Sequence, residues 1–254
     1  MARMILLGVG TAVPDVDRDH THMVWDGPGG PLLIDAGGST YQRLLRAGVD
    51  PQMLRGVLLT HSHTDHVNGL PALLFGMALV GRTEPLPIYG LEPTLTLVEG
   101  ILGAFQLGEH AAPIAWKPLQ AGDVVVLDRE TDWVLRTALT DHPRPCLALR
   151  FDESSGSRAL TYSCDTAPSP EVRDLARGST ILIHEATTPE PFSGHTTPRQ
   201  AGEIAAQAQV ARLVLVHFSP HWTMPEEQAL AEVRAGGFTG QAEVGQEYQV
   251  LELK

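Results

Sequence analysis

The sequence predicts an α/β protein in which two mixed β-sheets pack face to face and helices cover their outer faces. Three observations indicate this fold class: strand-like and helix-like segments alternate along the chain, the alternation falls into two strand-rich halves, and both halves carry helices. Sheets and helices each bury an apolar face, so two sheets that share a core and carry outer helices satisfy this pattern. A chain of 254 residues, 43% of them hydrophobic, is long enough to form this fold as one domain over residues 1–254.

In the first half, short apolar segments bounded by glycine, proline or polar residues predict strands, and longer segments predict helices. Ser39 is the expected N-cap of the first helix, and Gly48 is its expected stop. The expected strands are Met4–Val9, Met23–Asp26, Pro31–Asp35, Gly56–Leu59 and Leu86–Tyr89. The expected helices are Thr40–Ala47, Val67–Val80 and Pro93–Leu107.

The second half repeats the alternation. The polar segment 153–157 predicts a hairpin turn, and Thr197, Pro198 and Gln200 predict a capping box at a helix start. The expected strands are Asp123–Leu127, Trp133–Leu139, Cys146–Phe151, Arg158–Ser163, Thr180–His184, Arg212–Val216 and Tyr248–Leu253. The expected helices are Pro170–Ala176, Pro198–Gln207 and Pro225–Ala235.

Composition and charge exclude several classes of partner. The formal net charge of −12 argues against DNA and against broad binding of nucleic acid, which needs lysine and arginine to neutralise phosphates. No segment approaches the ~20 consecutive apolar residues of a membrane span. The N-terminal apolar run breaks at Gly8 and Gly10 without a cleavage site, so we expect a cytoplasmic protein. Cys146 and Cys164 are expected to be buried apolar residues.

The segment Thr60–His66 is the sharpest chemical signal in the chain. It reads Thr-His-Ser-His-Thr-Asp-His and follows a short apolar strand, so that three histidines and an aspartate lie within six positions. Imidazole binds zinc, iron or manganese, and carboxylate extends the preference toward harder ions. A lone histidine is usually structural, whereas this density predicts a metal site.

Further ligands are expected where other strands end. Polar candidates follow three later strands, just as the histidine-rich segment follows its own, so the strand ends are expected to converge at one edge of the fold. Two metals would then be held by two ligand sets. The first set is His61, His63 and His142, the second is Asp65, His66 and His217, and Asp165 bridges the two.

The pattern His61-x-His63-x-Asp65-His66, with a later His, Asp and His, resembles the metallo-β-lactamase superfamily. The similarity runs from the turn at residues 8–14 to His217 and is greatest to ribonuclease Z. Residues 32–37 with 42–46, residues 69–74, and His184-Glu-Ala-Thr187 with His195-Thr-Thr197 carry that likeness. The resemblance implies the metallo-β-lactamase αββα sandwich and two divalent ions, with zinc expected and manganese or iron as alternatives.

The resemblance also implies roles for individual residues. A metal-bridging hydroxide would attack phosphorus, with Asp65 counted among both the ligands and the catalytic residues. His195 would protonate the leaving oxygen, and Glu185 would orient and charge its ring. Asp35 resembles an aspartate that braces the metal loop in the family.

One departure from ribonuclease Z bears on the substrate. Members that process transfer RNA typically carry a basic arm between the positions of His142 and Asp165, and here only residues 143–164 separate the two. We therefore expect a phosphodiesterase (EC 3.1) that acts on small phosphodiesters or RNA 3′ ends. The likeness also implies a homodimer as the assembly. His221 stands near the place of an Arg-Tyr pair and is a candidate phosphate contact.

Two other functions remain open at this point. A hydroxide on two metals attacks carbonyl carbon as readily as phosphorus, so a lactonase, thioesterase, β-lactamase or sulfatase-like enzyme is the alternative. A metal-bound RNA-binding module without activity is a third, opposed by the full ligand set and the acidic charge. An oxygen-reducing di-iron site is disfavoured because that branch usually has Glu where His63 stands.

Overall fold

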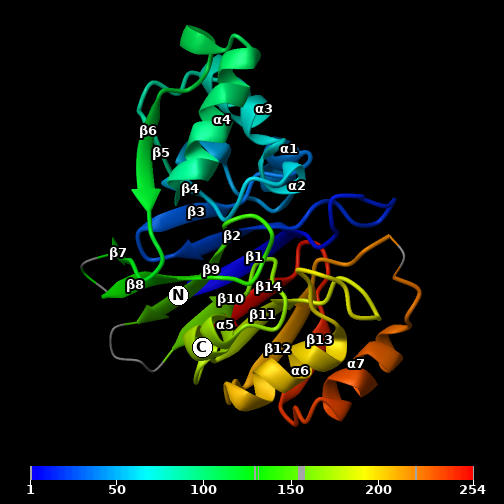
Figure 1. The fold of residues 1–254 in the computed structure, drawn as a ribbon. Helices are drawn as coiled ribbons and strands as arrows, with labels where there is room; N and C mark the ends of the chain where they lie inside the picture. Colours follow the sequence, from blue (N-terminus) through cyan, green and yellow to red (C-terminus); the bar gives the residue numbers. More distant parts are fainter. Residues whose placement is uncertain (1, 129, 131, 154–157, 221, 254) are drawn as a thin grey trace. The chain divides into compact units, whose positions relative to one another are not determined.

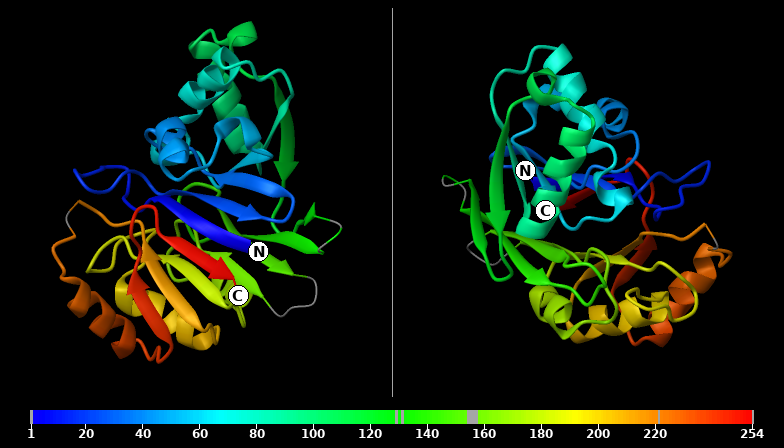
Figure 2. Two further views of the ribbon diagram at one scale, coloured as in Figure 1. Left: turned by 180° about the vertical axis from the view of Figure 1, so that it is seen from behind. Right: turned by 45° about the horizontal axis from the view of Figure 1, so that its top comes forward.

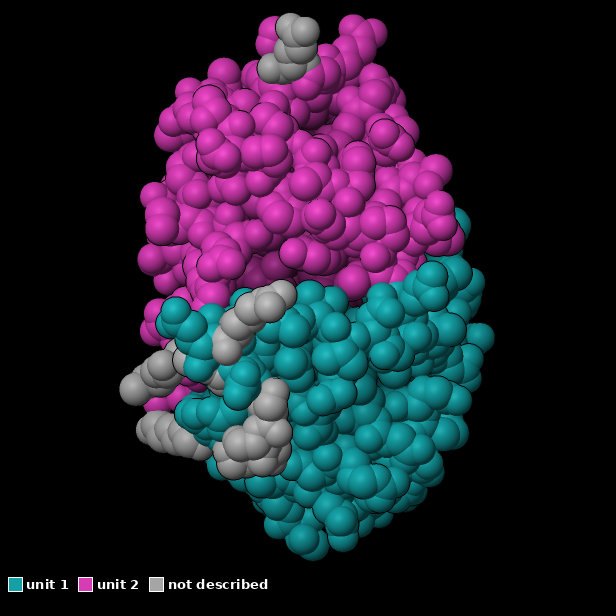
Figure 3. Space-filling model, turned by 90° about the vertical axis from the view of Figure 1, so that its left-hand side faces the viewer, with its two compact units in different colours: residues 1, 120–246, 253–254 teal, residues 2–119, 247–252 magenta. Residues whose placement is uncertain are grey.

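The computed structural model describes residues 2–128, 130, 132–153, 158–220 and 222–253 (Figure 1). Within these residues the chain divides into two compact units, coloured separately in Figure 3. Unit 2 comprises residues 2–119 and 247–252, and unit 1 comprises the described residues of 120–246 together with residue 253. Each unit contains one sheet with its own helices. The single domain over residues 1–254, with its sheets face to face, stays a prediction.

The sheet of unit 2 has seven strands in the described residues, in the order β14-β1-β2-β3-β4-β5-β6. Strands β1 to β3 pair antiparallel, and β3 to β6 pair parallel. The parallel strand β4 is buried along its whole length, as expected of apolar strands covered on both faces. The strands are β1 Ala2–Gly8, β2 His22–Gly27, β3 Gly30–Ile34, β4 Gly56–Leu59, β5 Leu86–Leu91, β6 Ile114–Leu119 and β14 Val250–Leu253.

The helices of unit 2 supply much of its core. α4 packs along β5 and β6 (Figure 1). Leucines and valines of α1, α3 and α4 join one apolar cluster with the strands. The helices are α1 Thr40–Arg46, α2 Thr64–Val67, α3 Leu70–Leu79 and α4 Glu92–Ala104, with the 3₁₀ turns η1 Pro51–Met53 and η2 Gly108–His110.

The sheet of unit 1 also has seven strands among the residues described, in the order β13-β12-β11-β10-β9-β8-β7. β7 to β10 pair antiparallel, and β10 to β13 pair parallel. Both sheets are therefore mixed, as predicted. The strands are β7 Val124–Asp128, β8 Trp133–Leu139, β9 Leu147–Glu153, β10 Ala159–Tyr162, β11 Ile181–Glu185, β12 Arg212–Val216 and β13 Gln241–Val244.

Three helices in the described part of unit 1 pack on its sheet: α5 Pro170–Ala176, α6 Pro198–Gln207 and α7 Glu226–Ala235. α6 and α7 lie side by side, in yellow and orange in Figure 2. The predicted capping box at Thr197 and Gln200 is confirmed, with both reciprocal bonds formed. Among the described residues, no helix is both long and apolar enough to cross a membrane.

Four local differences from prediction have physical causes. Ser39 makes no cap bond, because its hydroxyl donates to Asp19 Oδ2 at 3.1 Å instead. The helix predicted over Val67–Val80 begins at Leu70, with Pro71 in its first turn, and α2 precedes it as a separate helix. Strand β6 was not predicted because Lys117 and Pro118 interrupt its apolar pattern. Strand β13 was not predicted because its four residues are polar or only partly buried.

Two predictions concern residues beyond those described. Residues 154–157 of the expected hairpin turn lie outside the described residues, although β9 and β10 on either side pair antiparallel as expected. His221 also lies outside the described residues. Cys146 and Cys164 are both buried, as expected.

Candidate active site

The histidine-rich loop of unit 2 leaves the end of β4 and turns directly into α2. His63 occupies the N-cap position of α2, and Asp65 and His66 lie within it. His61 Nε2 and His63 Nδ1 are 2.9 Å apart, and the rings of His61 and His66 have centroids 4.1 Å apart. Asp65 Oδ2 lies 3.4 Å from His66 Nε2. The turn from strand to helix thus gathers the four predicted ligands of this unit.

Asp35 braces the loop, as predicted. This aspartate follows β3 with a φ of 59°, and its carboxylate accepts bonds from the Thr60 backbone N–H (2.7 Å), the Thr60 hydroxyl and His66 Nδ1 (2.7 Å). Burial raises the pKa of the Asp35 carboxyl, and the charge and hydrogen bonds of His66 and Thr60 oppose that shift. The carboxylate fixes both the start of the loop and the tautomer of His66.

The predicted ligands of unit 1 lie at the ends of three strands of its sheet. His217 follows β12 with a φ of 65°, and its Nε2 is 3.3 Å from Asp165 Oδ2, beyond β10. The Thr140 hydroxyl, at the end of β8, donates to the Asp165 carbonyl oxygen at 2.8 Å. These bonds draw together the segments that carry His142, Asp165 and His217.

Glu185, at the end of β11, is a buried hydrogen-bonding centre of unit 1. Its carboxylate accepts from the backbone N–H groups of Thr166 (2.7 Å) and Thr196 (3.1 Å). It also accepts from His195 Nδ1 at 2.9 Å and from the Thr187 hydroxyl. The two carboxylate oxygens of Glu185 therefore hold residues from three segments of the chain around His195, the predicted acid.

Sequence reasoning did not assign a role to Thr187. Because its hydroxyl donates to Glu185, it accepts a bond from His217 Nδ1 at 2.8 Å, and it lies 3.2 Å from His195 Nδ1. Thr187 thus connects a predicted metal ligand to the predicted acid. Its place two residues after Glu185, beyond the end of a strand, was the available signal.

The histidines share a protonation pattern. Nδ1 of His66, His142 and His217 donates to Asp35, Gly194 O (3.0 Å) and Thr187, respectively. His61 Nδ1 lies 3.2 Å from the Thr60 hydroxyl, which itself donates to Asp35. A histidine whose Nδ1 carries the proton presents Nε2 as its lone-pair donor, the usual arrangement of metal ligands.

The donor set fits divalent cations. Three pairs of possible ligand atoms lie 2.9–3.4 Å apart. They are His61 Nε2 with His63 Nδ1, Asp65 Oδ2 with His66 Nε2, and Asp165 Oδ2 with His217 Nε2. At metal–ligand distances of about 2.0–2.2 Å, one cation can contact both members of such a pair. Asp165, His195 and His217 also offer ligand atoms within 4.8 Å of one another. The structure brings the predicted ligands together in two sets, one in each unit.

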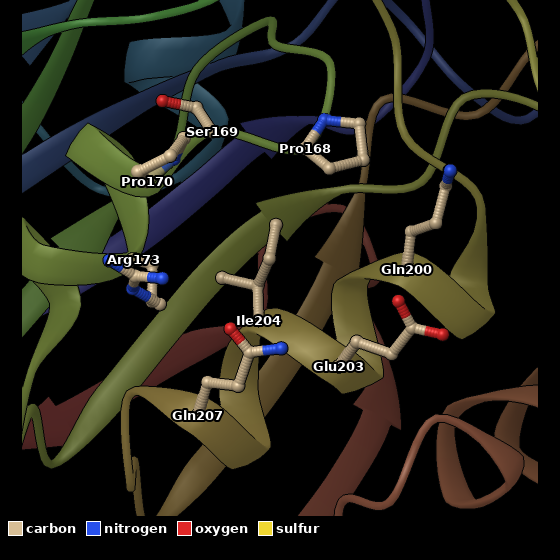
Figure 4. A pocket seen from close by; sticks show the side chains of 8 residues that line it. All are labelled: Pro168, Ser169, Pro170, Arg173, Gln200, Glu203, Ile204 and Gln207. Atoms are coloured by element: carbon tan, nitrogen blue, oxygen red, sulfur yellow. The ribbon is translucent and has the colours of Figure 1, made fainter.

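Unit 1 also contains a hollow of about 160 Å³ between α5 and α6, shown in Figure 4. Arg173 and Glu203 carry its charges, and Ile204 forms part of its wall. None of the predicted site residues lines it, so it plays no part in the candidate site.

Comparison with known proteins agrees with the predicted fold. The family model of the beta-lactamase superfamily domain matches residues 31–218. Ribonuclease Z of Methanothermobacter thermautotrophicus is 30% identical over 89% of this chain and 89% of its own. Ribonuclease Z of Mycobacterium avium is 31% identical over 100% of this chain and 99% of its own. The crystal structure of the metallo-beta-lactamase fold protein YhfI from Bacillus subtilis covers 99% of this chain and 100% of its own with a TM-score of 0.82 at 21% identity, which confirms the fold.

Proposed function

The chain belongs to the metallo-β-lactamase superfamily, and within it to the ribonuclease Z family of hydrolases, and on this premise we propose that it is a binuclear phosphodiesterase. Clusters of histidine and aspartate suited to divalent metal ions are present in both units. In the proposed centre, His61, His63 and His142 would hold one ion, Asp65, His66 and His217 would hold the other, and Asp165 would serve as a ligand to both. Zinc is the proposed metal.

The observation that carries the proposal is the contact between Glu185 and His195. Glu185 Oε1 lies 2.9 Å from His195 Nδ1, so the carboxylate holds the proton on Nδ1 and directs Nε2 away from itself. The ring of His195 stacks on that of His217 with centroids 5.6 Å apart. A proton donor is therefore held beside a proposed metal ligand, where a leaving alkoxide would need it.

The reaction follows from these positions. When bound, the divalent ions lower the pKa of a coordinated water and neutralise charge on the phosphate oxygens. As a water oxygen loses a proton to solvent and bonds to phosphorus, the bond from phosphorus to the leaving oxygen breaks, and His195 Nε2 gives that oxygen a proton. Glu185 stabilises the imidazolium that precedes this transfer, and its backbone N–H partners keep the carboxylate in place.

The proposed substrates are small phosphodiesters or RNA 3′ ends. The relatives are named ribonuclease Z, which supports RNA as the class of substrate. Between His142 and Asp165, the described residues form β9, β10 and their flanking turns. This short connection, together with a net charge of −12, favours a small substrate over a whole transfer RNA.

We also propose a cytoplasmic homodimer. The exposed apolar side chains of Leu45, Met53 and Leu79 lie on α1, η1 and the end of α3, which contact one another in unit 2. Such a patch supports an interface between copies of the chain. Light scattering coupled to size-exclusion chromatography measures the assembly directly, and a monomer at micromolar concentration would contradict this part of the proposal.

The function is tested by metal analysis combined with a substrate panel. The protein is loaded with Zn²⁺, Mn²⁺ or Fe²⁺, and its metal content and turnover are measured on an aryl phosphodiester, a 2′,3′-cyclic nucleotide, a precursor tRNA, a lactone and a β-lactam. We expect two ions per chain and the fastest turnover on a phosphodiester. Faster turnover of the lactone or the β-lactam would favour the alternative hydrolases, and no turnover with both ions bound would favour a binding module.

A further inference from the structure

Phe192 stands out on the surface of unit 1 because it is an aromatic residue that is 63% exposed next to the proposed acid. Its ring stacks on that of His195, with centroids 5.9 Å apart and planes inclined by 20°. The ring of His195 in turn stacks on that of His217, at 5.6 Å and 21°. Three rings thus form one stepped stack that runs from a proposed metal ligand to solvent.

A backbone turn fixes Phe192 in this place. The N–H of His195 donates to the Phe192 carbonyl oxygen at 3.1 Å, which closes the turn over residues 192–195. Gly194 has a φ of +79°, the conformation that the third position of a type II turn requires. A Cβ at Gly194 would lie 2.6 Å from Pro143 Cδ, so a side chain does not fit there.

The same turn also holds a proposed metal ligand. The Gly194 carbonyl oxygen accepts a hydrogen bond from His142 Nδ1 at 3.0 Å. The turn therefore connects His142, the proposed acid His195 and the exposed ring of Phe192 through its backbone. Because the turn is closed and tightly packed, the position of Phe192 relative to His195 is built into the fold.

There is room for a ligand next to this turn. A hollow of about 480 Å³ in unit 1 is lined by the segment 189–191, which leads into Phe192, and by side chains of both charges on α6 and α7, among them Arg199, Glu203 and Glu232. Its size lies within the usual range for small-molecule sites. By contrast, the hollow in Figure 4 lies on the α5 side of α6 and is lined by no residue of the 189–192 segment.

We propose that Phe192 is the platform on which the enzyme stacks a nucleobase carried by the leaving side of its substrate. The inference rests on the proposed phosphodiesterase function and specifies its substrate class as nucleotide diesters. His195 protonates the leaving oxygen, so the group bonded to that oxygen lies nearest to the turn that carries Phe192. Stacking of a base on an aromatic side chain is favourable for every base, which suits the proposed substrates, RNA 3′ ends of different sequence.

The test uses the metal-loaded protein and the ribodinucleotide ApA. Two analogues each lack one of the two bases, and product analysis shows which nucleoside carries the leaving oxygen. For the wild type we expect kcat/KM to fall on the order of tenfold when the leaving nucleoside loses its base, mainly through KM. Loss of the other base is expected to have a smaller effect.

The variants decide the role of the ring. In Phe192→Ala the preference for the base on the leaving side should disappear, whereas Phe192→Trp should keep it. Phe105→Ala is the matched control, because Phe105 is also 63% exposed but follows α4 in unit 2; it should retain the wild-type ratio. A ring that only positions His195 would instead lower kcat equally for all three substrates.

The outcomes separate this inference from the proposed function. Turnover of ApA by the wild type with an unchanged base preference in Phe192→Ala would overturn the role of Phe192 and leave the phosphodiesterase proposal standing. Absence of turnover on every diester with both ions bound would overturn the proposed function, and the stacking role with it.

Discussion

The two units carry their predicted ligands in different ways. In unit 2 the four ligands occupy six consecutive positions and depend on one buried carboxylate, Asp35. In unit 1 the three ligands are spread from residue 142 to residue 217 and depend on strand ends and on the network of Glu185 and Thr187. The local set is fixed by one turn of chain, whereas the distributed set depends on the register of a whole sheet.

The units also differ in chemistry. The loop of unit 2 provides metal ligands and their support, whereas unit 1 combines ligands with a proton donor and the turn that presents Phe192. Under the proposed mechanism, substitutions in unit 2 should act mainly on metal affinity, and substitutions around Glu185 should act mainly on the chemical step. Substitutions of His195, Asp35 and Thr187 test this division.

The largest effect is expected from His195→Ala. Loss of a general acid typically lowers kcat by 10² to 10⁴, and here both ions should remain bound. The assay is diester turnover with metal analysis of the same sample, and His110→Ala, at an exposed histidine of unit 2, is the control. Loss of an ion in His195→Ala would reassign this residue as a ligand, and unchanged turnover would remove it from the mechanism.

The second-largest expected effect is on the pH dependence of stability, and it arises from His22 on β2 of unit 2. Burial lowers the pKa of His22 from 6.5 to about 4, although the carbonyl oxygen of His20 and the charge of Asp19 favour protonation. The unfolded chain therefore binds a proton that the folded chain excludes. The folding free energy that depends on a neutral His22 is fully present above pH 6.5. It decreases by about 3 kcal/mol as the pH drops from 6.5 to 4.

Urea unfolding between pH 7 and pH 4 measures this loss. In His22→Asn the slope of unfolding free energy against pH should be shallower, since the amide can still donate to the His20 carbonyl but does not titrate. An unchanged slope would show that other groups cause the acid destabilisation.

Asp35→Asn should weaken metal binding about 10- to 100-fold, because an amide no longer accepts from both His66 Nδ1 and the Thr60 groups. Zinc titration with a competing chelator measures the affinity. Turnover at saturating metal should recover much of the wild-type rate if unit 2 mainly holds ions. Full loss of turnover despite bound metal would contradict the division between the units.

The smallest effect is expected from Thr187→Val, the counterpart in unit 1. The isosteric change removes a neutral hydrogen bond with His217, which contributes about 1 kcal/mol, and one of several bonds to the Glu185 carboxylate, whose partners His195 and the Thr166 and Thr196 N–H groups remain. We expect a decrease of kcat by up to about tenfold with a smaller change in zinc affinity. If Thr187→Val lowered zinc affinity more than Asp35→Asn does, unit 1 and not unit 2 would be the main determinant of metal binding.

The same contrast explains what could be predicted from the sequence. The ligands of the 60–66 loop are visible because contiguous residues need no tertiary information. His142, Asp165 and His217 were predicted only through their positions after apolar strands and through family resemblance. The bonds of Thr187 and the stack of Phe192 on His195 depend on how the segments after β11 and β12 meet, which no local pattern encodes.

The fold itself was predictable where strands are apolar and continuous, as in β4 and β11. Prediction failed where a tertiary partner or a polar edge decided the outcome. Asp19, twenty residues away, captures the hydroxyl of Ser39, and β13 pairs with β12 although its own residues carry little apolar signal.

The path of the chain has a consequence for its synthesis. Unit 1 is inserted within unit 2, whose residues 247–252 return to β1 through Tyr248 N–H to Leu6 O and Leu6 N–H to Gln249 O. The edge of β1 that pairs with these residues therefore stays unpaired until residues 247–252 have been synthesised. During translation, unit 1 can form its sheet before unit 2 is complete. Until β14 pairs with β1, the β1 edge of unit 2 is unpaired and can pair with strands of other chains.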